Sequence, residues 1–349
     1  MTRPPPDPAA PARITVHDVA REAGVAIGTV SRVVNGAPSV TADVRQRVER
    51  AIAHLGWTPS MAAQTMRGGS ARMVGFIFSD IRNPLYSSMV KGAEDVLSEH
   101  GYMLIVASSD GSPDRELSLI DLFQRRRADG LLFSVEQESH PGVQRSVASL
   151  AFPVVLLERE MDVPVNAVGA DHAAGIEQAA KHLIDMGHRR IALISGGANN
   201  RVGRDRLAGL TRAHDAAGIP VDADLLRLQS FASDYGFRET QMLLGLARPP
   251  TAIIAAGMHL LEGVLPAIRM KGLSIPGDVS LVASNDTPLA RLATPAISVI
   301  RYDAYALGRE AANMLLRRIR KEEPPSRARI DIPVEFVMRA SCAAPRAPA

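Results

Sequence analysis

The sequence contains a single cysteine, Cys342, among its 349 residues, so no disulfide can form within the chain. Such sparse cysteine usage is typical of a reducing compartment, and we expect a cytoplasmic protein. There is also no run of about 20 consecutive apolar residues, which excludes an ordinary membrane-spanning helix. The opening stretch, MTRPPPDPAAPAR, has no apolar core, so residues 1–12 are expected to be a disordered lead rather than a signal peptide or an anchor.

Motifs of enzymes and metal sites are also missing. The sequence has no G-x-S-x-G, no P-loop and no G-x-G-x-x-G of dinucleotide spacing after a strand-like run. The nine histidines include no H-x-x-x-H pair, and one cysteine cannot complete a zinc set. Glu136 and Glu138 fall in an expected loop, where paired carboxylates are more often solvated than catalytic. We therefore expect no enzyme activity, no cofactor and no metal.

The positive charge is concentrated at the start of the chain. Residues 1–70 hold eight Arg and five Asp or Glu, whereas the remaining 279 residues hold 32 basic and 32 acidic side chains. The whole formal charge of +3 therefore lies in the first fifth. A small basic segment on a neutral body is typical of a head that binds a polyanion. An ordinary solvated surface explains so small an excess equally well.

Two helical patterns frame the early part of the chain. In TVHDVAREAG, apolar residues recur at helical spacing after a capping-box pair, Thr15 and Asp18, and Gly24 ends the pattern. In TADVRQRVERAIAHLG, Thr41 is the expected cap and Gly56 the end. Between the two lies the stretch GVAIGTVSRVVNG.

This middle stretch, residues 24–36, predicts a short helix with one apolar face. Val30, Val33 and Val34 form that face, and we expect the remaining side chains to point elsewhere. Two short helices joined by a tight turn, with a third that buries their apolar faces, predict a helix-turn-helix domain over residues 13–58. The second helix would enter the major groove of DNA with its N-terminal residues first. A three-helix bundle of some other purpose stays open.

The outward residues of the second helix suit several kinds of DNA contact. Arg32 could bind guanine or phosphate, and Thr29 and Ser31 could bind phosphates. Ile27 could lie against a thymine methyl group. The sequence thus predicts that the polar side of this helix faces DNA.

The head resembles that of the LacI/GalR family of bacterial transcription regulators, through the runs ITVHDVAREAGVAIGTVSRVVNG and VRQRVERAIAHLGWTPS. The elements DVA, AGV, TVSRV and GWTP occur in the same order and at the same spacing as in that family. The resemblance implies that the two residues ahead of Thr-Val-Ser, Ile27 and Gly28, choose the operator bases. The predicted DNA contacts of the head are Thr15, Ile27, Gly28, Thr29, Ser31, Arg32 and Asn35.

Two positions of the head depart from the family pattern. Ala26 stands where the family usually has a helix-capping Ser, and losing an N-cap oxygen costs about 1 kcal/mol. Gly28 has no side chain with which to form a hydrogen bond to a base edge. These departures keep open a second hypothesis, a small-molecule-binding protein whose DNA-binding head is degenerate.

The segment PSMAAQTMRGGS, residues 59–70, offers about two turns of helix, which is marginal in water. A plain linker is one interpretation. The resemblance implies instead a hinge helix that orders on operator DNA, pairs with its dimer mate and inserts an apolar side chain into the minor groove. Met66 stands at the family's inserting position, usually Leu, and Ala63 matches the small residue that lets the two hinge helices approach.

The body, residues 71–340, alternates short apolar runs with amphipathic segments. Such alternation predicts parallel sheets with helices on both faces, and the length suits two such units. The predicted fold class is thus an all-α helix-turn-helix head followed by an α/β body. The apolar runs are MVGFIF, YMLIVAS, GLLFSV, FPVVLLE, IALISG, TAIIAA, VSLVAS and ISVIRY.

The resemblance extends through the body, on the segments FSDIRNPLYSSMVKGAE, GHRRIALISG, RDRLAGL, PGDVSLVASND and YALGREAANMLLRRI. It implies two Rossmann-like lobes of the periplasmic-binding-protein type, about 72–165 with 290–325, and 166–289 with 326–345. A tail, residues 341–349, has no leucine heptads, so nothing supports a coiled-coil tetramer. The effector contacts that the resemblance implies are Tyr86, Glu158, Arg204, Phe231 and Asn285.

Two departures in the expected pocket bear on the effector. Gly257-Met258 replaces the family's usual Asn-Asp, and Asn285 replaces the first Asp of an Asp-Asp pair. Both changes remove groups that accept hydrogen bonds from sugar hydroxyls, while Arg204 remains. We therefore hypothesise an effector other than a plain neutral hexose, such as a sugar acid or another organic acid.

Together these features predict a sequence-specific transcriptional regulator, most simply a repressor, that binds a pseudo-palindromic operator as a homodimer. A small metabolite in the interlobe cleft, a sugar, sugar acid or related compound, would control it allosterically. We expect double-stranded DNA as its partner, no membrane contact, and association with the nucleoid when DNA is bound.

Overall fold

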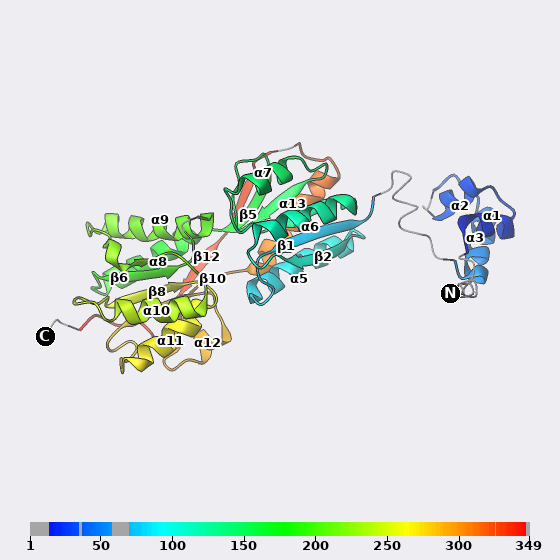
Figure 1. Ribbon diagram of the computed structural model, residues 1–349. Helices are drawn as coiled ribbons and strands as arrows, with labels where there is room; N and C mark the ends of the chain where they lie inside the picture. Colours follow the sequence, from blue (N-terminus) through cyan, green and yellow to red (C-terminus); the bar gives the residue numbers. More distant parts are fainter. Residues whose placement is uncertain (1–13, 35–36, 58–69, 198, 325, 347–349) are drawn as a thin grey trace, which may run out of the picture. The chain divides into compact units, whose positions relative to one another are not determined.

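The computed structural model describes residues 14–34, 37–57, 70–197, 199–324 and 326–346. The chain divides into two units, Met1–Ala71 and Arg72–Ala349, which we call the head and the body (Figure 1). The predicted disordered lead and all but the last residue of the predicted hinge lie outside the described residues. Among the described residues, no helix combines the length and the hydropathy that crossing a membrane requires.

The head contains the three predicted helices, α1 (Val16–Ala23), α2 (Ile27–Val34) and α3 (Ala42–Leu55). Their apolar faces meet in one small core, as the spacing of the apolar residues predicts. Because each helix alone is too short to be stable in water, this shared core is what holds them. The buried residues of the core are Val19, Ala20, Ala23, Val30, Val33, Val48 and Ala51.

The ends of α1 are capped by local contacts. The Asp18 carboxylate accepts hydrogen bonds from the backbone N–H of Thr15 at 2.9 Å and from its hydroxyl at 2.7 Å. At the other end, Gly24 adopts a left-handed conformation with φ of 62°, which favours glycine. The Arg47 guanidinium of α3 donates to the carbonyl oxygen of Ala23 at 2.9 Å, so the third helix fixes the turn between the first two.

The body is built on two six-stranded sheets, in the orders β11-β5-β4-β3-β1-β2 and β12-β10-β9-β8-β6-β7. All neighbouring strands are parallel except the antiparallel pair β10 and β12. The strands are β1 (Met73–Phe78), β2 (Met103–Ser108), β3 (Gly130–Phe133), β4 (Val154–Leu157), β5 (Asn166–Ala170), β6 (Ile191–Ser195), β7 (Leu226–Arg227), β8 (Ala252–Ala256), β9 (Ser280–Ser284), β10 (Ser298–Tyr302), β11 (Arg329–Ile332) and β12 (Val334–Val337).

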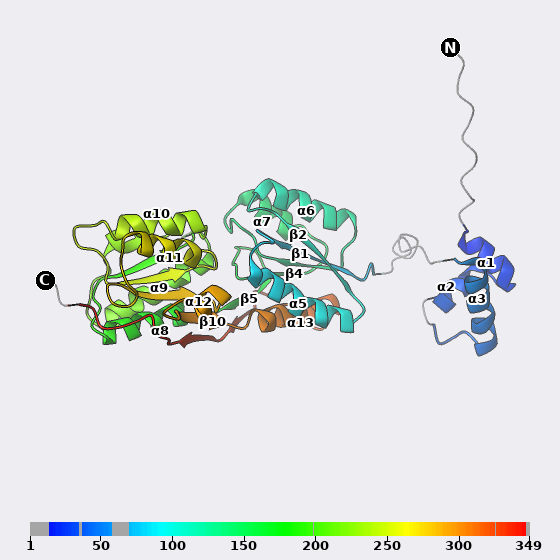
Figure 2. The ribbon, with the colours of Figure 1, turned by 90° about the horizontal axis from the view of Figure 1, so that it is seen from below.

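Helices cover both faces of each sheet (Figures 1 and 2). In the first sheet α5 and α13 bury one face and α6 and α7 the other. In the second sheet α10 and α11 bury one face and α8 and α9 the other. The helices are α5 (Pro84–Glu99), α6 (Pro113–Arg125), α7 (Pro141–Ala148), α8 (His172–Asp185), α9 (Arg201–Ala216), α10 (Ser233–Leu243), α11 (Leu260–Met270), α12 (Pro288–Leu292) and α13 (Ala304–Ile319), with a 3-10 turn at Ala223–Leu225.

The eight predicted apolar runs are confirmed as strands, and β5, β7, β11 and β12 were not predicted. These four are short or carry polar residues, so the apolar pattern misses them. Helices on both faces of a sheet predict buried strands, but β2 lies at a sheet edge and Met103 is 62% exposed. An apolar run can therefore belong to an edge strand that remains accessible.

The chain passes between the two sheets at three points, and these differ from the predicted lobe boundaries. β5 and β11 belong to the first sheet and β10 belongs to the second, each opposite to the prediction. Lobe 1 therefore comprises about residues 72–170 and 303–332, and lobe 2 about residues 171–302 and 333–346. The boundaries were wrong because the same apolar pattern fits either sheet, and only strand pairing decides membership.

Candidate functional site

Helix α2 presents two different faces. Val30 and Val33 are buried in the core of the head, whereas Gly28 and Arg32 are exposed. Thr29 and Ser31 are half-buried. Among the residues that the structure describes, the Arg32 side chain forms no hydrogen bond or ion pair, so its guanidinium is available for a phosphate or a base.

The prediction that Ile27 points away from the apolar face is wrong. Ile27 is half-buried and packs against the core of the head. It lies three residues before Val30 and seven before Val34, and these spacings place all three on one side of a helix. Only part of the Ile27 side chain is therefore available to a base.

Ala26 begins α2, since its carbonyl oxygen accepts hydrogen bonds from the N–H groups of Thr29 at 2.8 Å and Val30 at 3.3 Å. Its methyl group cannot accept a hydrogen bond from the first turn, as the sequence predicts. The helix forms nonetheless, because its valines are buried against α1 and α3. The loss of the capping oxygen therefore does not remove the motif.

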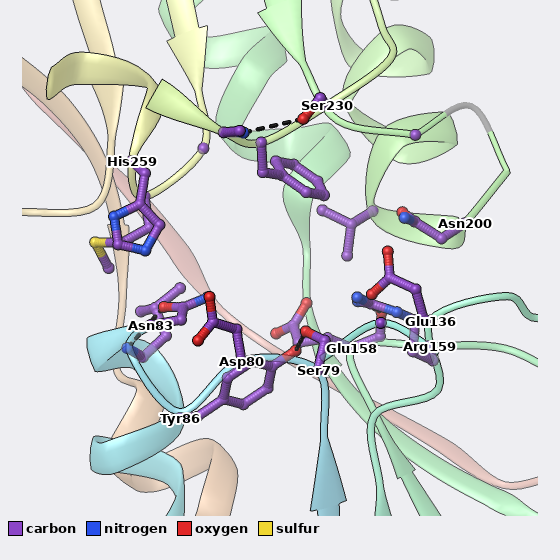
Figure 3. A pocket seen from close by; sticks show the side chains of 18 of the residues that line it. Ser79, Asp80, Asn83, Tyr86, Glu136, Glu158, Arg159, Asn200, Ser230 and His259 are labelled. Carbon is purple, nitrogen blue, oxygen red and sulfur yellow. Dashed lines mark hydrogen bonds between the residues drawn. The ribbon is translucent and has the colours of Figure 1, made fainter. Parts of the chain in front are cut away.

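The body contains a cavity of about 820 Å³ whose lining comes from both lobes. It lies beyond the carboxyl ends of the parallel strands, where ligands of such sheets usually bind. Figure 3 shows Asp80, Asn83 and Tyr86 on one side, with Ser230 and Asn200 on the other. Four of the five predicted effector residues line it, namely Tyr86, Glu158, Phe231 and Asn285.

Tyr86 is buried on α5 and holds a fixed position in the cavity wall. Its ring stacks on Phe78 with 4.8 Å between the ring centroids. Its hydroxyl lies 3.0 Å from the hydroxyl of Ser134. The ring is thus packed from behind, and its edge lines the space between the lobes.

Arg204 does not belong to the described lining of the cavity. Its guanidinium instead forms ion pairs with Glu138 at 2.8 Å and Glu160 at 3.5 Å, both in lobe 1. The side chain is 47% exposed. The predicted effector contact therefore serves as a link between the lobes.

Arg206, two residues further along α9, does line the cavity. Its Nη1 donates to the carbonyl oxygen of Ala256 at 2.6 Å and to the hydroxyl of Ser195 at 3.3 Å. Its Nε has no hydrogen-bond partner among the described residues. Burial lowers the pKa of Arg206 to about 10, so it stays a cation at neutral pH. A buried guanidinium with an unused donor calls for an acceptor on a ligand.

The Phe231 ring covers this guanidinium, with 5.4 Å between the ring centroid and Cζ of Arg206. Glycines at the ends of β6 and β8 make room for the ring. A Cβ added at Gly196 would lie 2.3 Å from the ring, and one at Gly257 would lie 2.9 Å from it. Gly257 is one of the departures noted in the sequence, and the structure explains it because Phe231 fills that space.

Glu158 lines the cavity, but both of its carboxylate oxygens are already engaged. Oε1 accepts a hydrogen bond from the N–H of Ala170 at 3.1 Å, and Oε2 accepts one of 2.5 Å from Nε2 of His172. Burial raises the pKa of Glu158, but the attraction of His172 and this hydrogen bond outweigh burial, so the pKa lies below its ordinary value. Glu158 therefore stabilises the segment through which the chain passes from lobe 1 into lobe 2.

Arg159, which was not among the predicted effector residues, is a second buried guanidinium in the cavity. Its Nε donates to the carbonyl oxygen of Val135 at 2.6 Å. Burial lowers the pKa of Arg159, but Tyr86 and nearby glutamates outweigh that effect and raise it. The signal in the sequence was an arginine directly after a predicted buried strand, at the end where ligands bind.

Glu158 and Asn285 both adopt a left-handed backbone, with φ of 60° and 70°. Such conformations are unfavourable for residues other than glycine and occur often at binding sites. Both residues follow the carboxyl ends of strands, β4 and β9. Both residues line the cavity at these positions.

Comparisons with known proteins agree with this arrangement. The family model described as "Bacterial regulatory proteins, lacI family" matches residues 15–60, and a "Periplasmic binding protein-like domain" matches residues 180–342. The HTH-type transcriptional regulator DegA of Bacillus subtilis is 30% identical over 332 residues, which are 94% of this chain and 98% of that protein. The chain belongs to the LacI family of bacterial regulatory proteins.

Other relatives of this LacI-family chain support the same conclusion. Catabolite control protein A of Priestia megaterium is 30% identical over 88% of this chain and 93% of its own length. The lac repressor dimer bound to operator and the anti-inducer ONPF is 27% identical, covers 95% of this chain and 99% of its own, and has a TM-score of 0.82. A complex of the regulator CelR with cellobiose is 30% identical, covers 94% of this chain and 100% of its own, and has a TM-score of 0.73.

The family resemblance noted in the sequence is thus confirmed, and this LacI-family chain is a DNA-binding transcriptional regulator. The predicted fold class is confirmed as well. Three of the predicted DNA contacts, Asn35, Ala63 and Met66, lie outside the described residues. Thr15 is exposed at the start of α1, with its hydroxyl directed to Asp18.

Arg206 could have been found in the sequence. It lies four residues after Val202 and four before Leu210, both buried on the same face of α9. An arginine within such an apolar stripe must be buried, and a buried arginine needs acceptors. The family resemblance instead implied Arg204, two positions earlier, which points to a different side of the helix.

Proposed function

We propose that this regulator represses transcription as a homodimer on a pseudo-palindromic operator, under the control of an organic acid bound between its lobes. The observation that carries the proposal is the exposed side of α2 that bears Arg32, together with the buried Arg206 guanidinium in the body's cavity, whose Nε has no partner among the described residues. Two heads related by a two-fold axis would read two half-sites. The protein would act in the cytoplasm, on the nucleoid when DNA is bound, and without catalysis.

The proposed DNA contacts follow the exposure of α2. Arg32 binds a phosphate or guanine, Thr29 and Ser31 bind phosphates, and the exposed part of Ile27 contacts a thymine methyl group. Gly28 lets the backbone of α2 approach the base edges closely, since nothing lies within 4 Å of a Cβ added there. Thr15, Asn35 and the hinge residues Ala63 and Met66 complete the predicted set.

The effector proposal is supported by the charges of the cavity. On the lobe 2 side, Arg206 is the one Arg, Lys, Asp or Glu among the described lining residues. Four acids line the lobe 1 side, and three of them are paired: Asp80 with Arg82, Asp110 with Arg115, and Glu158 with His172, whereas Glu136 has no ion pair among the described residues. A ligand carboxylate would therefore meet the free Nε of Arg206 on the side of the cavity whose described lining carries no acid. Known relatives bind neutral sugars, among them a regulator in complex with cellobiose.

The first experiment is selection of bound sequences from a random duplex pool by the full-length protein at physiological salt. A two-fold symmetric consensus is the expected result. Weak, salt-sensitive and sequence-independent binding, unchanged when metabolites are added, would favour the alternative of a degenerate head, for which Ala26 and Gly28 are the motivating residues.

The effector proposal has its own test by calorimetry with panels of sugar acids, other organic acids and neutral hexoses. We expect binding among the acids, lost in Arg206→Met and retained in Arg212→Met, whose guanidinium lies on the same helix and pairs with Glu177. Tight binding of a neutral hexose, equal in Arg206→Met and the native protein, would contradict the proposal.

A further inference from the structure

Glu138 connects the two lobes at one edge of the cavity. It lies in the loop after β3 of lobe 1 and is only 5% exposed. Its Oε2 accepts a hydrogen bond from Nη2 of Arg204 at 2.8 Å, and its Oε1 accepts one from the backbone N–H of Arg201 at 2.9 Å. Both donors belong to the first turn of α9 in lobe 2. One buried carboxylate therefore holds the start of a helix from the opposite lobe.

The carboxylate is itself fixed within lobe 1. The backbone N–H of Glu160 donates to Oε1 of Glu138 at 3.0 Å, and the side-chain amide of Gln144 donates to its carbonyl oxygen at 2.8 Å. The partially positive N-terminus of α9 also favours a carboxylate at this place. Separation of the lobes would leave Oε1 of Glu138 with the Glu160 N–H alone and would remove the Arg204 hydrogen bond from Oε2.

Further ion pairs also join α9 of lobe 2 to lobe 1. The Arg201 guanidinium lies 3.6 Å from the carboxylate of Asp331 and 3.9 Å from that of Glu160, both in lobe 1. It also pairs with Asp205 on its own helix at 3.0 Å, which keeps the side chain in place. Arg204 adds its contact with Glu160 at 3.5 Å.

The burial of each contact decides how much it contributes to holding the lobes together. Exposed ion pairs such as Arg204 with Glu160 contribute little. The Glu138 side chain is 7% exposed, and separating the lobes would leave its carboxylate without Arg204 and without the Arg201 N–H. A charge-assisted hydrogen bond to a buried carboxylate contributes more than an exposed ion pair, although Arg204 itself is 47% exposed. The contacts of Glu138 are therefore the ones that resist separation of the lobes.

We propose that Glu138 and Arg204 form an interlobe bridge that sets the spacing of the lobes when no effector is bound and positions Arg206 at the cavity. Arg204 is then a positioning residue that acts through the N-terminal turn of α9. Arg206 lies half a turn further on the same helix, so a shift of that turn moves its guanidinium relative to Arg159 in lobe 1. The bridge stands on these contacts alone, whereas its effect on regulation rests on the function proposed above.

The bridge can be tested in the full-length protein without any effector. Hydrogen–deuterium exchange of peptides that contain Arg201 reports the N–H that donates to Glu138. We expect exchange there to be roughly tenfold faster or more in Glu138→Gln and in Arg204→Gln, because a hydrogen bond to a charged acceptor is weakened or its acceptor displaced. Arg212→Gln is the matched control, since Arg212 lies on α9 and pairs with Glu177 inside lobe 2.

A distance measurement separates positioning from simple loss of stability. In a Cys342→Ser background, spin labels at Gln124 on α6 and Asp215 on α9, both exposed, report the spacing of the lobes. We expect a longer or broader distance distribution in Arg204→Gln, with the native distribution restored by Arg204→Lys. An unchanged distribution and unchanged exchange in Arg204→Gln would overturn the bridge, even if Glu138→Gln fails to fold.

The same variants distinguish failure of the bridge from failure of the proposed function. If the lobes separate in Arg204→Gln, the bridge stands, whatever the variant does to DNA binding. A symmetric operator consensus, determined separately with the native protein, supports the regulator. Normal lobe spacing in Arg204→Gln together with an intact operator consensus would refute the bridge and leave the regulator unaffected.

Discussion

The Glu158 carboxylate accepts a hydrogen bond of 2.5 Å from Nε2 of His172, at the point where the chain passes from β5 of lobe 1 into α8 of lobe 2. Both side chains are nearly inaccessible, at 6% and 7% exposure. The pair lies at the base of the cavity and on a connection between the lobes at once. A ligand that touches this wall thus contacts one of the three chain segments that connect the lobes.

This pair gives the first prediction. The pKa of Glu158 lies below its ordinary value, so the pair stabilises the fold above the ordinary carboxyl pKa, and this contribution is lost as the pH falls through the lower folded value. We expect Glu158→Gln to lose about 2 kcal/mol at pH 7, since Gln keeps an acceptor for Ala170 but not the charged hydrogen bond. Urea unfolding of both proteins between pH 4 and 8 measures this difference in free energy of unfolding. The difference should shrink toward pH 4.

Glu94→Gln serves as the control, because Glu94 is 52% exposed and pairs only with Lys91 at 3.3 Å among the described residues. We expect a change within about 0.5 kcal/mol at any pH. A loss in Glu158→Gln that stays the same from pH 8 to pH 4 would show that the charge of Glu158 is not what matters.

Glu116 gives a prediction of the opposite sign. It is fully buried on α6, with Oε1 accepting from the N–H of Glu136 at 2.8 Å and Oε2 without a partner among the described residues. Burial raises its pKa to about 7. A carboxyl whose folded pKa is raised favours folding below its ordinary pKa and costs stability as the pH rises through 7. Glu116→Gln should therefore be about 1–2 kcal/mol more stable than the native protein at pH 8 and similar near pH 5.

A stability difference that is the same at pH 5 and pH 8 would contradict ionisation of Glu116 in this range.

Arg32 gives a prediction about DNA. Arg32→Ala should weaken operator binding by about tenfold or more, because it removes a charged hydrogen bond to a phosphate or a guanine. If Arg32 contacts a phosphate, Arg32→Ala would lower the slope of log binding constant against log salt concentration by about one, whatever the DNA sequence. If Arg32 contacts a guanine, the variant would relax the consensus at one position. Arg50→Ala on α3 removes the same charge from an exposed site and is the control. Equal losses in the two variants would mean that Arg32 contributes only general electrostatic attraction.

Two glycines give a paired prediction. A Cβ added at Gly257 would lie 2.9 Å from Phe231 and from Leu260, both packed in lobe 2, whereas nothing lies within 4 Å of one added at Gly28. Gly257→Ala should lower the stability of the body by about 1–3 kcal/mol through overpacking. Gly28→Ala should stabilise the head by about 0.5–1 kcal/mol, because alanine favours a helix over glycine. Hydrogen exchange, resolved by domain, measures both, and an unchanged body in Gly257→Ala would show that Phe231 can move aside freely.

Most of the local structure follows from the sequence. The period of the valines in GTVSRVV places them on one side of a helix before any partner is known, and the eight apolar runs become strands because their residues favour a buried, extended backbone. The glycines at the ends of α1 and α3 likewise adopt left-handed conformations that their lack of a side chain permits. These features depend on neighbours within a few residues.

The tertiary structure decided the features that depend on which surfaces meet. The sequence by itself determined the helix-turn-helix head and the alternation of strands and helices, and its family resemblance implied Tyr86, Phe231 and Asn285, which line the cavity. It did not determine which sheet β5, β10 and β11 join, because a strand's apolar pattern does not name its partner. It also did not distinguish Arg204 from Arg206. Two residues turn a helix by roughly 200°, so only the placement of α9 against both lobes shows which guanidinium faces the cavity and which one faces Glu138.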